Sequence, residues 1–275
     1  MNKFDPTQAA FTGDNIIDNV EQVFIGLTTP GNYTVRVKHK GILQAEQFFG
    51  LIVTYGASIP EMVHVAPSGN DDTGDGSTDN PFASIQAALN FANENQTIHV
   101  ASGTYIENIE WPYLTSGIKL LGAGIDNSII DGGSNGTVIS IATWVDGGTA
   151  SQIDTSTHIS GFTIQNGFGA YAGGIFLEWA GPTLTDLDIR ENDGSRGAGM
   201  HVSWSWPIIR NVTIRDNEAS DWGGGLYLTM THTNLPDRKA ILENVIISGN
   251  RNTADRGGGL YVSQAAVDII HSAII

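Results

Sequence analysis

The 275-residue chain contains no cysteine, which excludes disulfide bonds, thiolate catalysis and cysteine-based zinc sites. Charged residues make up only 15% of the sequence, and basic ones are the scarcest. Thirteen Lys and Arg stand against 29 Asp and Glu, which gives a net charge of −16. Binding to a phosphate backbone needs clustered Lys and Arg, so the sequence predicts no nucleic-acid partner.

Long apolar runs and the common catalytic motifs are missing as well. No stretch of 18 apolar residues is present, so we expect no insertion into a membrane. The seven histidines have neither HExxH nor His-x-His spacing, which argues against metal catalysis. The absence of a GxSxG elbow and of a Walker loop argues against serine-hydrolase and nucleotide chemistry.

Glycine is abundant, with 34 residues, and much of it belongs to a repeat with two apolar strand segments. The first segment carries isoleucines 25, 25 and 33 residues apart: Ile164, Ile189, Ile214 and Ile247. The second carries an apolar residue after a glycine run: Ile175, Met200, Leu226 and Leu260. Two short strands per repeat are typical of a parallel β-helix, in which stacked coils complete one another's core. The intervals leave no room for strand–helix–strand units.

Glycines and asparagines recur at the corners of the predicted coils. The glycine runs at 197–199, 223–225 and 257–259 precede the second strand. A tight corner there needs a positive φ or a close approach of two backbone segments. Asn192, Asn217 and Asn250 follow the first strand. We expect these asparagines to hydrogen-bond along the solenoid axis and to tolerate left-handed dihedral angles.

These motifs, I-x-x-N and GG-G-[IL], resemble the repeats of polymorphic outer-membrane-type proteins and of pectate-lyase-like β-helices. The segment VAPSGNDDTGDGSTDNPFASIQAAL resembles the opening segment of secreted bacterial β-helix proteins. Within it, Ser84 is the expected N-cap of a short helix, residues 84–93, that closes the core. The resemblance implies an all-β fold, a right-handed parallel β-helix over residues 59–275. The repeat stops at Ile274-Ile275 without a cap, so we expect a C-terminally truncated solenoid.

The first 58 residues predict a different structure. Apolar residues at 33, 35 and 37 alternate with polar ones, as in a half-buried antiparallel strand. The segments GDNIIDNVEQVFI, PGNYTVRVKHKG and QFFGLIVTYG resemble the end of the β-sandwich that follows the catalytic domain of secreted subtilisin-like proteases. We therefore expect residues 1–58 to be a partial antiparallel β-sandwich. None of the protease's catalytic motifs is present.

A mixed-charge group is predicted on the outer face of the first strand row: Asp188, Arg190, Arg215 and Asp216. β-Helix polysaccharide lyases use an exposed basic residue to abstract a proton beside a uronate, helped by Ca²⁺ held on carboxylates. The four residues are therefore the catalytic candidates, although no lyase motif surrounds them. Ion pairs along stacked strands give the same pattern and are the favoured interpretation.

An aromatic row is predicted on the outer face of the second strand row, with two tryptophans in a nearby turn. Aromatic faces with polar neighbours suit sugar rings. The alternative is that the stacked rings only stabilise the sheet. The candidate ligand-binding residues are Phe176, His201, Tyr227, Tyr261, Trp204 and Trp206.

The acidic loop with Asp71, Asp72 and Asp75 offers oxygen ligands at short spacing. It does not match the EF-hand pattern. These aspartates are the candidates for a structural Ca²⁺, the only cofactor that the sequence suggests. A polar capping turn is the favoured alternative.

Together these features predict a secreted or cell-surface β-helix module of bacterial type, non-catalytic and monomeric, that binds a polysaccharide or a surface partner. Two alternatives stay open. One is a polysaccharide lyase or glycoside hydrolase that acts on the β-helix face. The other is a fragment of a secreted subtilisin-like serine protease without its catalytic domain.

Overall fold

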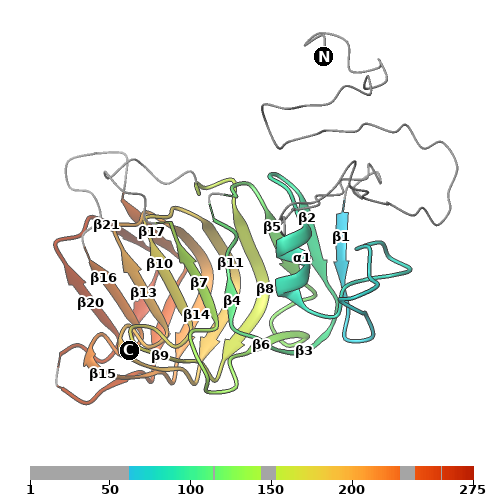
Figure 1. Cartoon of the computed structure of the whole chain (residues 1–275). Helices are drawn as coiled ribbons and strands as arrows, with labels where there is room; N and C mark the ends of the chain where they lie inside the picture. Colours follow the sequence, from blue (N-terminus) through green and yellow to red (C-terminus); the bar gives the residue numbers. More distant parts are fainter. Residues whose placement is uncertain (1–61, 114, 144–152, 230–238, 255) are drawn as a thin grey trace, which may run out of the picture. The chain divides into compact units, whose positions relative to one another are not determined.

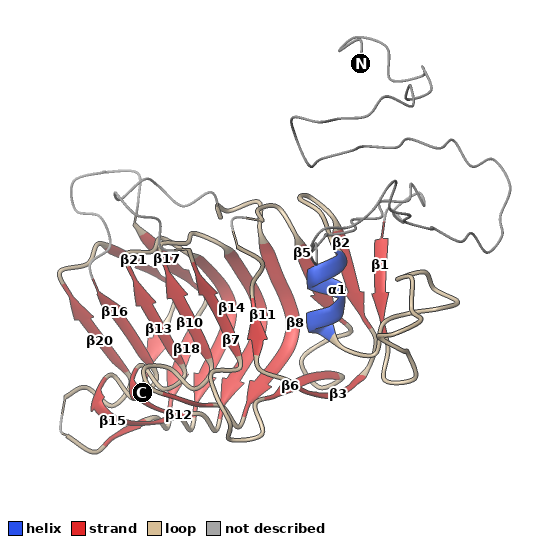
Figure 2. Ribbon diagram, in the orientation of Figure 1, coloured by secondary structure: helices blue, strands red, loops and turns tan. Residues whose placement is uncertain are grey.

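A computed structural model describes residues 62–113, 115–143, 153–229, 239–254 and 256–275 (Figure 1). These residues fall within one compact unit of the chain. They are mostly β, with three parallel sheets and one short helix (Figure 2). The β-sandwich predicted for residues 1–58 lies outside the described residues. No helix in the described ranges has the length and apolar character needed to span a bilayer.

The three sheets run along the stacked coils, and every neighbouring pair of strands is parallel. Sheet A comprises β1 (Met62–Val65), β2 (Thr97–Val100), β3 (Gly103–Ile106), β5 (Lys119–Gly122), β6 (Ser128–Asp131), β8 (His158–Gln165), β11 (Thr183–Arg190), β14 (Ile208–Arg215), β17 (Ala240–Glu243), β18 (Ile246–Ser248), β21 (Val267–Ile270) and β22 (Ala273–Ile274). Sheet B comprises β4 (Ile109–Glu110), β7 (Ile139–Ala142), β10 (Ile175–Glu178), β13 (Met200–Ser203), β16 (Leu226–Thr229) and β20 (Leu260–Ser263). Sheet C comprises β9 (Phe168–Gly169), β12 (Asp193–Arg196), β15 (Glu218–Trp222) and β19 (Arg251–Asn252).

The strand register confirms both apolar rows expected from the repeat. In sheet A, Ile189 pairs with Ile164 on one side and with Ile214 on the other, and Ile214 pairs with Ile247. In sheet B, the equivalent positions of β10, β13, β16 and β20 also pair in turn. Both rows point into one core, which is completed by neighbouring coils.

Helix α1 (Ile85–Phe91) lies against the first coil, as the apolar face of the opening segment predicts. The Ser84 hydroxyl accepts a hydrogen bond from the backbone N–H of Ala87, which confirms Ser84 as the N-cap. Ile85 and Leu89 are fully buried in the same core as the strands. The helix therefore covers apolar surface at the end of the stack, where no earlier coil is described.

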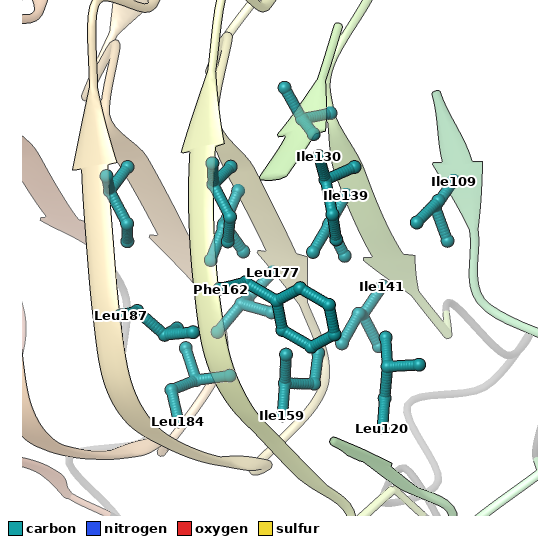
Figure 3. Close-up of a cluster of buried hydrophobic side chains, with 14 of the residues drawn as sticks. Ile109, Leu120, Ile130, Ile139, Ile141, Ile159, Phe162, Leu177, Leu184 and Leu187 are labelled. Atoms are coloured by element: carbon teal, nitrogen blue, oxygen red, sulfur yellow. The ribbon is translucent and has the colours of Figure 1, made fainter. Parts of the chain in front are cut away.

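Phe162 on β8 is the largest of the fully buried side chains (Figure 3). Leu120, Ile159 and Leu177 lie around it in the same cluster. A side chain at Gly122 would approach the Phe162 ring to 2.9 Å, so the glycine leaves the space that the ring occupies. Dense contact of this kind makes the core sensitive to the loss of a few atoms.

The asparagines form the hydrogen-bonded ladder that the repeat predicts. Asn192 Nδ2 donates to Asn217 Oδ1 at 3.0 Å, and Asn217 Nδ2 donates to Asn250 Oδ1 at 2.9 Å. Each Nδ2 also reaches a backbone carbonyl one coil earlier, as in the 3.0 Å bond from Asn217 to Ile189. Asn192 and Asn217 are almost fully buried, at 0% and 1% exposure. Each ladder position thus ties neighbouring coils together inside the protein.

The left-handed dihedral angles fall one residue before the ladder, which corrects the prediction for these asparagines. Glu191 and Asp216 both have φ near +54°, whereas the asparagines that follow them have none of this strain. The glycine runs serve both purposes proposed for them. Gly223 has φ +57°, and a Cβ at Gly199 would lie 2.8 Å from Asn217 Nδ2. The glycines therefore allow the coil to pass close to the asparagine ladder.

Candidate ligand-binding face

The predicted aromatic row exists on the outer face of sheet B. Phe176, His201, Tyr227 and Tyr261 are direct register partners on four successive strands. The ring centroids are 5.3 Å apart for Phe176 and His201, 4.9 Å for His201 and Tyr227, and 5.6 Å for Tyr227 and Tyr261. The His201 ring stands nearly perpendicular to its two neighbours. The spacing follows from the distance between paired strands.

A second aromatic layer covers this row. Tyr171 stacks on Phe176 with an interplanar angle of 15°, and Trp222 stacks on Tyr227 with an angle of 16°. His201 and Tyr227 consequently retain only 4% and 7% exposure. The sequence pattern placed these two rings on the ligand surface, but they form its inner layer. Tyr171 is 48% exposed and belongs to the outer layer instead.

Two arginines flank the outer layer. The guanidinium of Arg196 lies 4.2 Å from the Trp222 ring centroid, and that of Arg256 lies 5.3 Å from it. Asp221 accepts a hydrogen bond from each arginine, at 3.3 Å and 3.1 Å. This arrangement holds cationic and aromatic groups together at the corner between sheets C and B. Arg196, Asp221 and Arg256 were not among the predicted site residues, because nothing in the repeat indicates that their turns fold over the aromatic row.

A polar row runs beside the aromatic row on the same outer face. Glu178, Ser203, Thr229 and Ser263 are register partners. No described residue forms a hydrogen bond with any of these four side chains. Burial raises the pKa of the Glu178 carboxyl, which has no ion pair within the described ranges. Ser203 and Thr229 are buried, at 9% and 7% exposure, whereas Glu178 and Ser263 are half-buried. Glu178 and Ser263 are therefore the members of this row that can bond to a ligand.

Two tryptophans stand at the bend that follows the polar row. Trp179 and Trp204 stack with ring centroids 4.9 Å apart and an interplanar angle of 5°. Both have a positive φ, which repeats the same backbone bend on neighbouring coils. Trp206 lies over Gly181, where a Cβ would come within 2.2 Å of the indole nitrogen. The polar row thus lies between two bands of aromatic side chains.

His201 carries the strongest electrostatic perturbation of this face. Burial lowers the pKa of the imidazole to about 4. A hydrogen bond with the Arg196 backbone opposes this shift, and the Arg196 charge adds to it. The Nδ1 atom of His201 has no hydrogen-bond partner. The folded protein therefore holds a neutral imidazole, while the unfolded chain binds a proton near the ordinary pKa of 6.5.

The free energy of unfolding should consequently fall as the pH is lowered, over a window set by the pKa of His201. The contribution of the neutral imidazole is complete above pH 6.5 and is lost as the pH falls toward 4. His201→Phe is expected to remove a loss on the order of 3 kcal/mol between pH 7.5 and pH 4. Urea unfolding at both pH values measures the difference. The same change at the exposed His99 should leave the pH dependence as it is, and an equal effect of both variants would refute the assignment.

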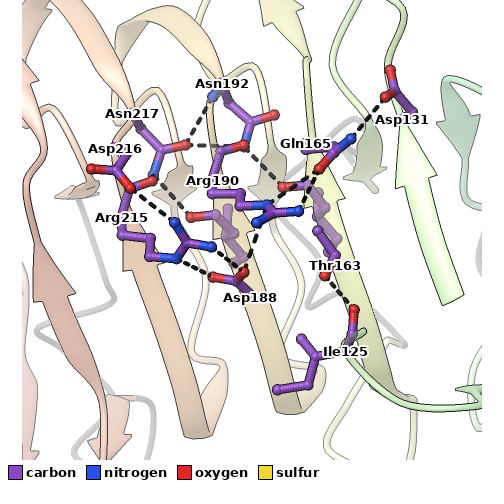
Figure 4. A network of polar contacts seen from close by, with 12 residues as sticks. Ile125, Asp131, Thr163, Gln165, Asp188, Arg190, Asn192, Arg215, Asp216 and Asn217 are labelled. Atoms are coloured by element: carbon purple, nitrogen blue, oxygen red, sulfur yellow. Dashed lines mark hydrogen bonds and ion pairs between the residues drawn. The ribbon is translucent and has the colours of Figure 1, made fainter. Parts of the chain in front are cut away.

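The four catalytic candidates come together on the outer face of sheet A as an ion-pair network (Figure 4). Asp188 accepts hydrogen bonds from Nε and Nη2 of Arg215 at 3.0 Å and 2.8 Å. Arg215 Nη1 also pairs with Asp216 at 2.9 Å. Arg190 lies 3.7 Å from Asp188 and donates to Gln165. The hydrogen bonds that Arg215 donates to Asp188 raise the pKa of Arg215, so this guanidinium holds its proton and suits a structural role better than that of a general base.

The three metal candidates do not form a ligand set. Asp71 accepts hydrogen bonds from the backbone N–H groups of Ala83 and Ser84 at 2.7 Å and 2.9 Å. Asp75 accepts one from the backbone two residues later. Within the described ranges, no group of three or more His, Asp or Glu side chains is placed to hold a metal ion. The geometry supports the alternative of a capping turn at the start of α1, and Asp72 has no part in either arrangement.

The stacked coils and the layered aromatic face define a parallel β-solenoid protein with a candidate ligand-binding face on sheet B. Residues 67–272 match a family model described as "Protein of unknown function (DUF1565)", and the chain belongs to this family. A search of curated proteins finds no match. The match begins at residue 67, and the comparisons give no support to a relation between residues 1–58 and subtilisin-like proteases.

Proposed function

We propose that this chain is a right-handed parallel β-helix of the pectate-lyase-like type that binds polysaccharide through the outer face of sheet B. It acts as a secreted or cell-surface module of a bacterium. The observation that carries the proposal is the half-buried Glu178 between the aromatic row of sheet B and the stacked pair of Trp179 and Trp204. Sugar rings present apolar faces and hydroxyl edges, so a polar strip bordered by aromatic rings offers contacts for both.

Repetition along the solenoid supports a polymer as the ligand. Neighbouring coils present the Trp179 and Trp204 rings with their centroids 4.9 Å apart, since the coils repeat at the spacing of paired parallel strands. A linear chain of sugar units can contact several coils at once. Weak contacts at each coil would then add to a useful affinity.

The Trp179–Trp204 pair provides the test. Trp204→Ala is expected to weaken binding to a recognised polysaccharide about tenfold, because a stacked ring contributes on the order of 1 kcal/mol. Affinity electrophoresis against a panel of plant and bacterial polysaccharides measures the change. Phe168→Ala is the control, since Phe168 is an aromatic residue with 60% exposure that lies on β9 of sheet C and not on sheet B. Unchanged binding by the Trp204 variant would contradict the proposal.

A polysaccharide lyase or glycoside hydrolase is the second candidate, and Glu178 is the observation in its favour. A half-buried carboxyl with a raised pKa and no ion pair among the described residues is suited to general acid catalysis. Incubation with pectin, alginate and neutral glycans, followed by detection of unsaturated uronides and reducing ends, tests it. Products from the wild type that disappear with Glu178→Gln would establish catalysis and overturn the non-catalytic proposal.

A further inference from the structure

A second concave region lies on the outer face of sheet A, away from the proposed polysaccharide-binding face. It is a hollow of about 410 Å³ lined by Asn95, Gly117, Lys119, Thr155, Ser156, His158 and Thr183. Lys119, His158 and Thr183 are register partners on β5, β8 and β11, so they form one row across three strands. Apart from Gly117, every lining residue has a polar side chain. A hollow with this lining favours a polar ligand over an apolar one.

A chain of hydrogen bonds fixes the orientation of the His158 imidazole. Ser160 Oγ donates to the Asp186 carboxylate at 3.4 Å, and Thr185 Oγ1 donates to Ser160 Oγ at 3.0 Å. The Thr185 proton is thus used, so the 2.8 Å contact with His158 Nε2 must be an N–H donated by the histidine. His158 Nδ1 has no hydrogen-bond partner in the described part of the chain. It is the ring nitrogen left for a ligand.

Lys119 supplies the charge of the hollow. Its ammonium group forms no ion pair with any described residue, whereas Lys239, just before β17, pairs with Asp268 on β21. The carboxylates nearest to the hollow are already engaged. Asp154 accepts hydrogen bonds from the backbone and the hydroxyl of Ser156, and Asp186 accepts them from Ser160 and Asn211. A free ammonium group beside hydroxyl and amide groups is suited to an anionic ligand.

We propose that this hollow binds a uronate, a sugar unit that carries a carboxylate. Lys119 takes the carboxylate, while Asn95, Thr155 and the Nδ1 lone pair of His158 bond to the sugar hydroxyls. The volume exceeds what an inorganic anion fills, and the polar lining matches a polyol. The site is on a different sheet from the proposed polysaccharide-binding face and does not rest on that function.

The experiment titrates the full chain with free galacturonate and glucuronate, with galactose and glucose as neutral counterparts and with sulfate as a simple anion. NMR signals of the His158 ring report binding directly. Burial lowers the pKa of His158, Lys119 adds to that effect, and Asp186 opposes it. A bound carboxylate should therefore raise the His158 pKa, whereas a neutral sugar should leave it unchanged.

Lys119→Met is expected to weaken uronate binding about tenfold, because it removes a charge-assisted hydrogen bond. Lys239→Met is the matched control and should bind as the wild type does. Lys119→Arg, which keeps the charge, should retain most of the affinity. Equal affinity of the Lys119→Met variant and the wild type would overturn the proposal, as would equal affinity for sulfate and uronate. Because free monosaccharides are used, loss of polymer binding at sheet B would not affect this result.

Discussion

Asn217→Asp is expected to lower the free energy of unfolding by about 3 kcal/mol or more at neutral pH. The replacement keeps the shape of the side chain but removes the Nδ2 donor. Nδ2 of Asn217 donates to the carbonyls of Ile189 and Arg215 and to Asn250 Oδ1, and its surroundings are buried. A carboxylate oxygen would face three acceptors without a proton between them. Urea unfolding followed by circular dichroism measures the loss.

The exposed Asn244 provides the matched control for this variant. Its side chain also bonds to an asparagine one coil away, through the 2.8 Å contact with Asn211 Oδ1, but it does so at the surface. Asn244→Asp should therefore cost less than about 1 kcal/mol, since water can solvate the new charge. Losses of equal size at Asn217 and Asn244 would show that burial of the ladder contributes little to stability.

Phe162→Ala is expected to cost about 4 kcal/mol, within the usual range for removal of a buried aromatic ring. Phe162 has no exposed surface, and Gly122 leaves no side chain that could move into the space. The resulting cavity would lie between adjacent coils and weaken their contact. Thermal unfolding and urea titration both report the change.

Phe168→Ala is the companion variant, because Phe168 on β9 is 60% exposed. Its removal should change stability by no more than about 0.5 kcal/mol. A large loss at Phe168 together with a small loss at Phe162 would mean that the core is not where the strand register places it.

The rows of the solenoid were predictable because each coil needs an apolar side chain at the same core position and an amide side chain at the same corner. Ile164, Ile189 and Ile214 fill equivalent core positions, and the asparagines after them meet the same backbone groups on every coil. A fixed repeat therefore reveals both the apolar positions and the ladder. The helix that follows Ser84 was predictable for a local reason, since its N-cap and its apolar face lie within a few consecutive residues of the sequence.

Sheet C and the cover over the aromatic row were not predictable in the same way. The strands of sheet C are short and polar, as in β12 from Asp193 to Arg196, so they lack an alternating apolar pattern. The stacking of Trp222 on Tyr227 joins a turn residue to a strand residue, and no periodic rule connects them. For that reason the inner and outer layers of the aromatic face could not be distinguished from the sequence.

The hollow beside Lys119 could not be predicted from the sequence either. Its lining comes from loops and strands of several coils, with Asn95 before β2, Lys119 on β5 and His158 on β8. The hydrogen bonds that orient His158 depend on Ser160 and Thr185, which look like ordinary surface positions of a strand. Only the strand pairing brings these groups together.

The most direct test of the proposed function is the response of the tryptophan indole NMR signals to a bound oligosaccharide. Trp179, Trp204 and Trp222 belong to the aromatic bands of sheet B, whereas Trp111 is buried at the other end of the described solenoid. Binding through this face predicts shifts of the first three indole signals during titration, with the Trp111 signal unchanged. An oligosaccharide that binds while these three signals stay fixed would contradict the account.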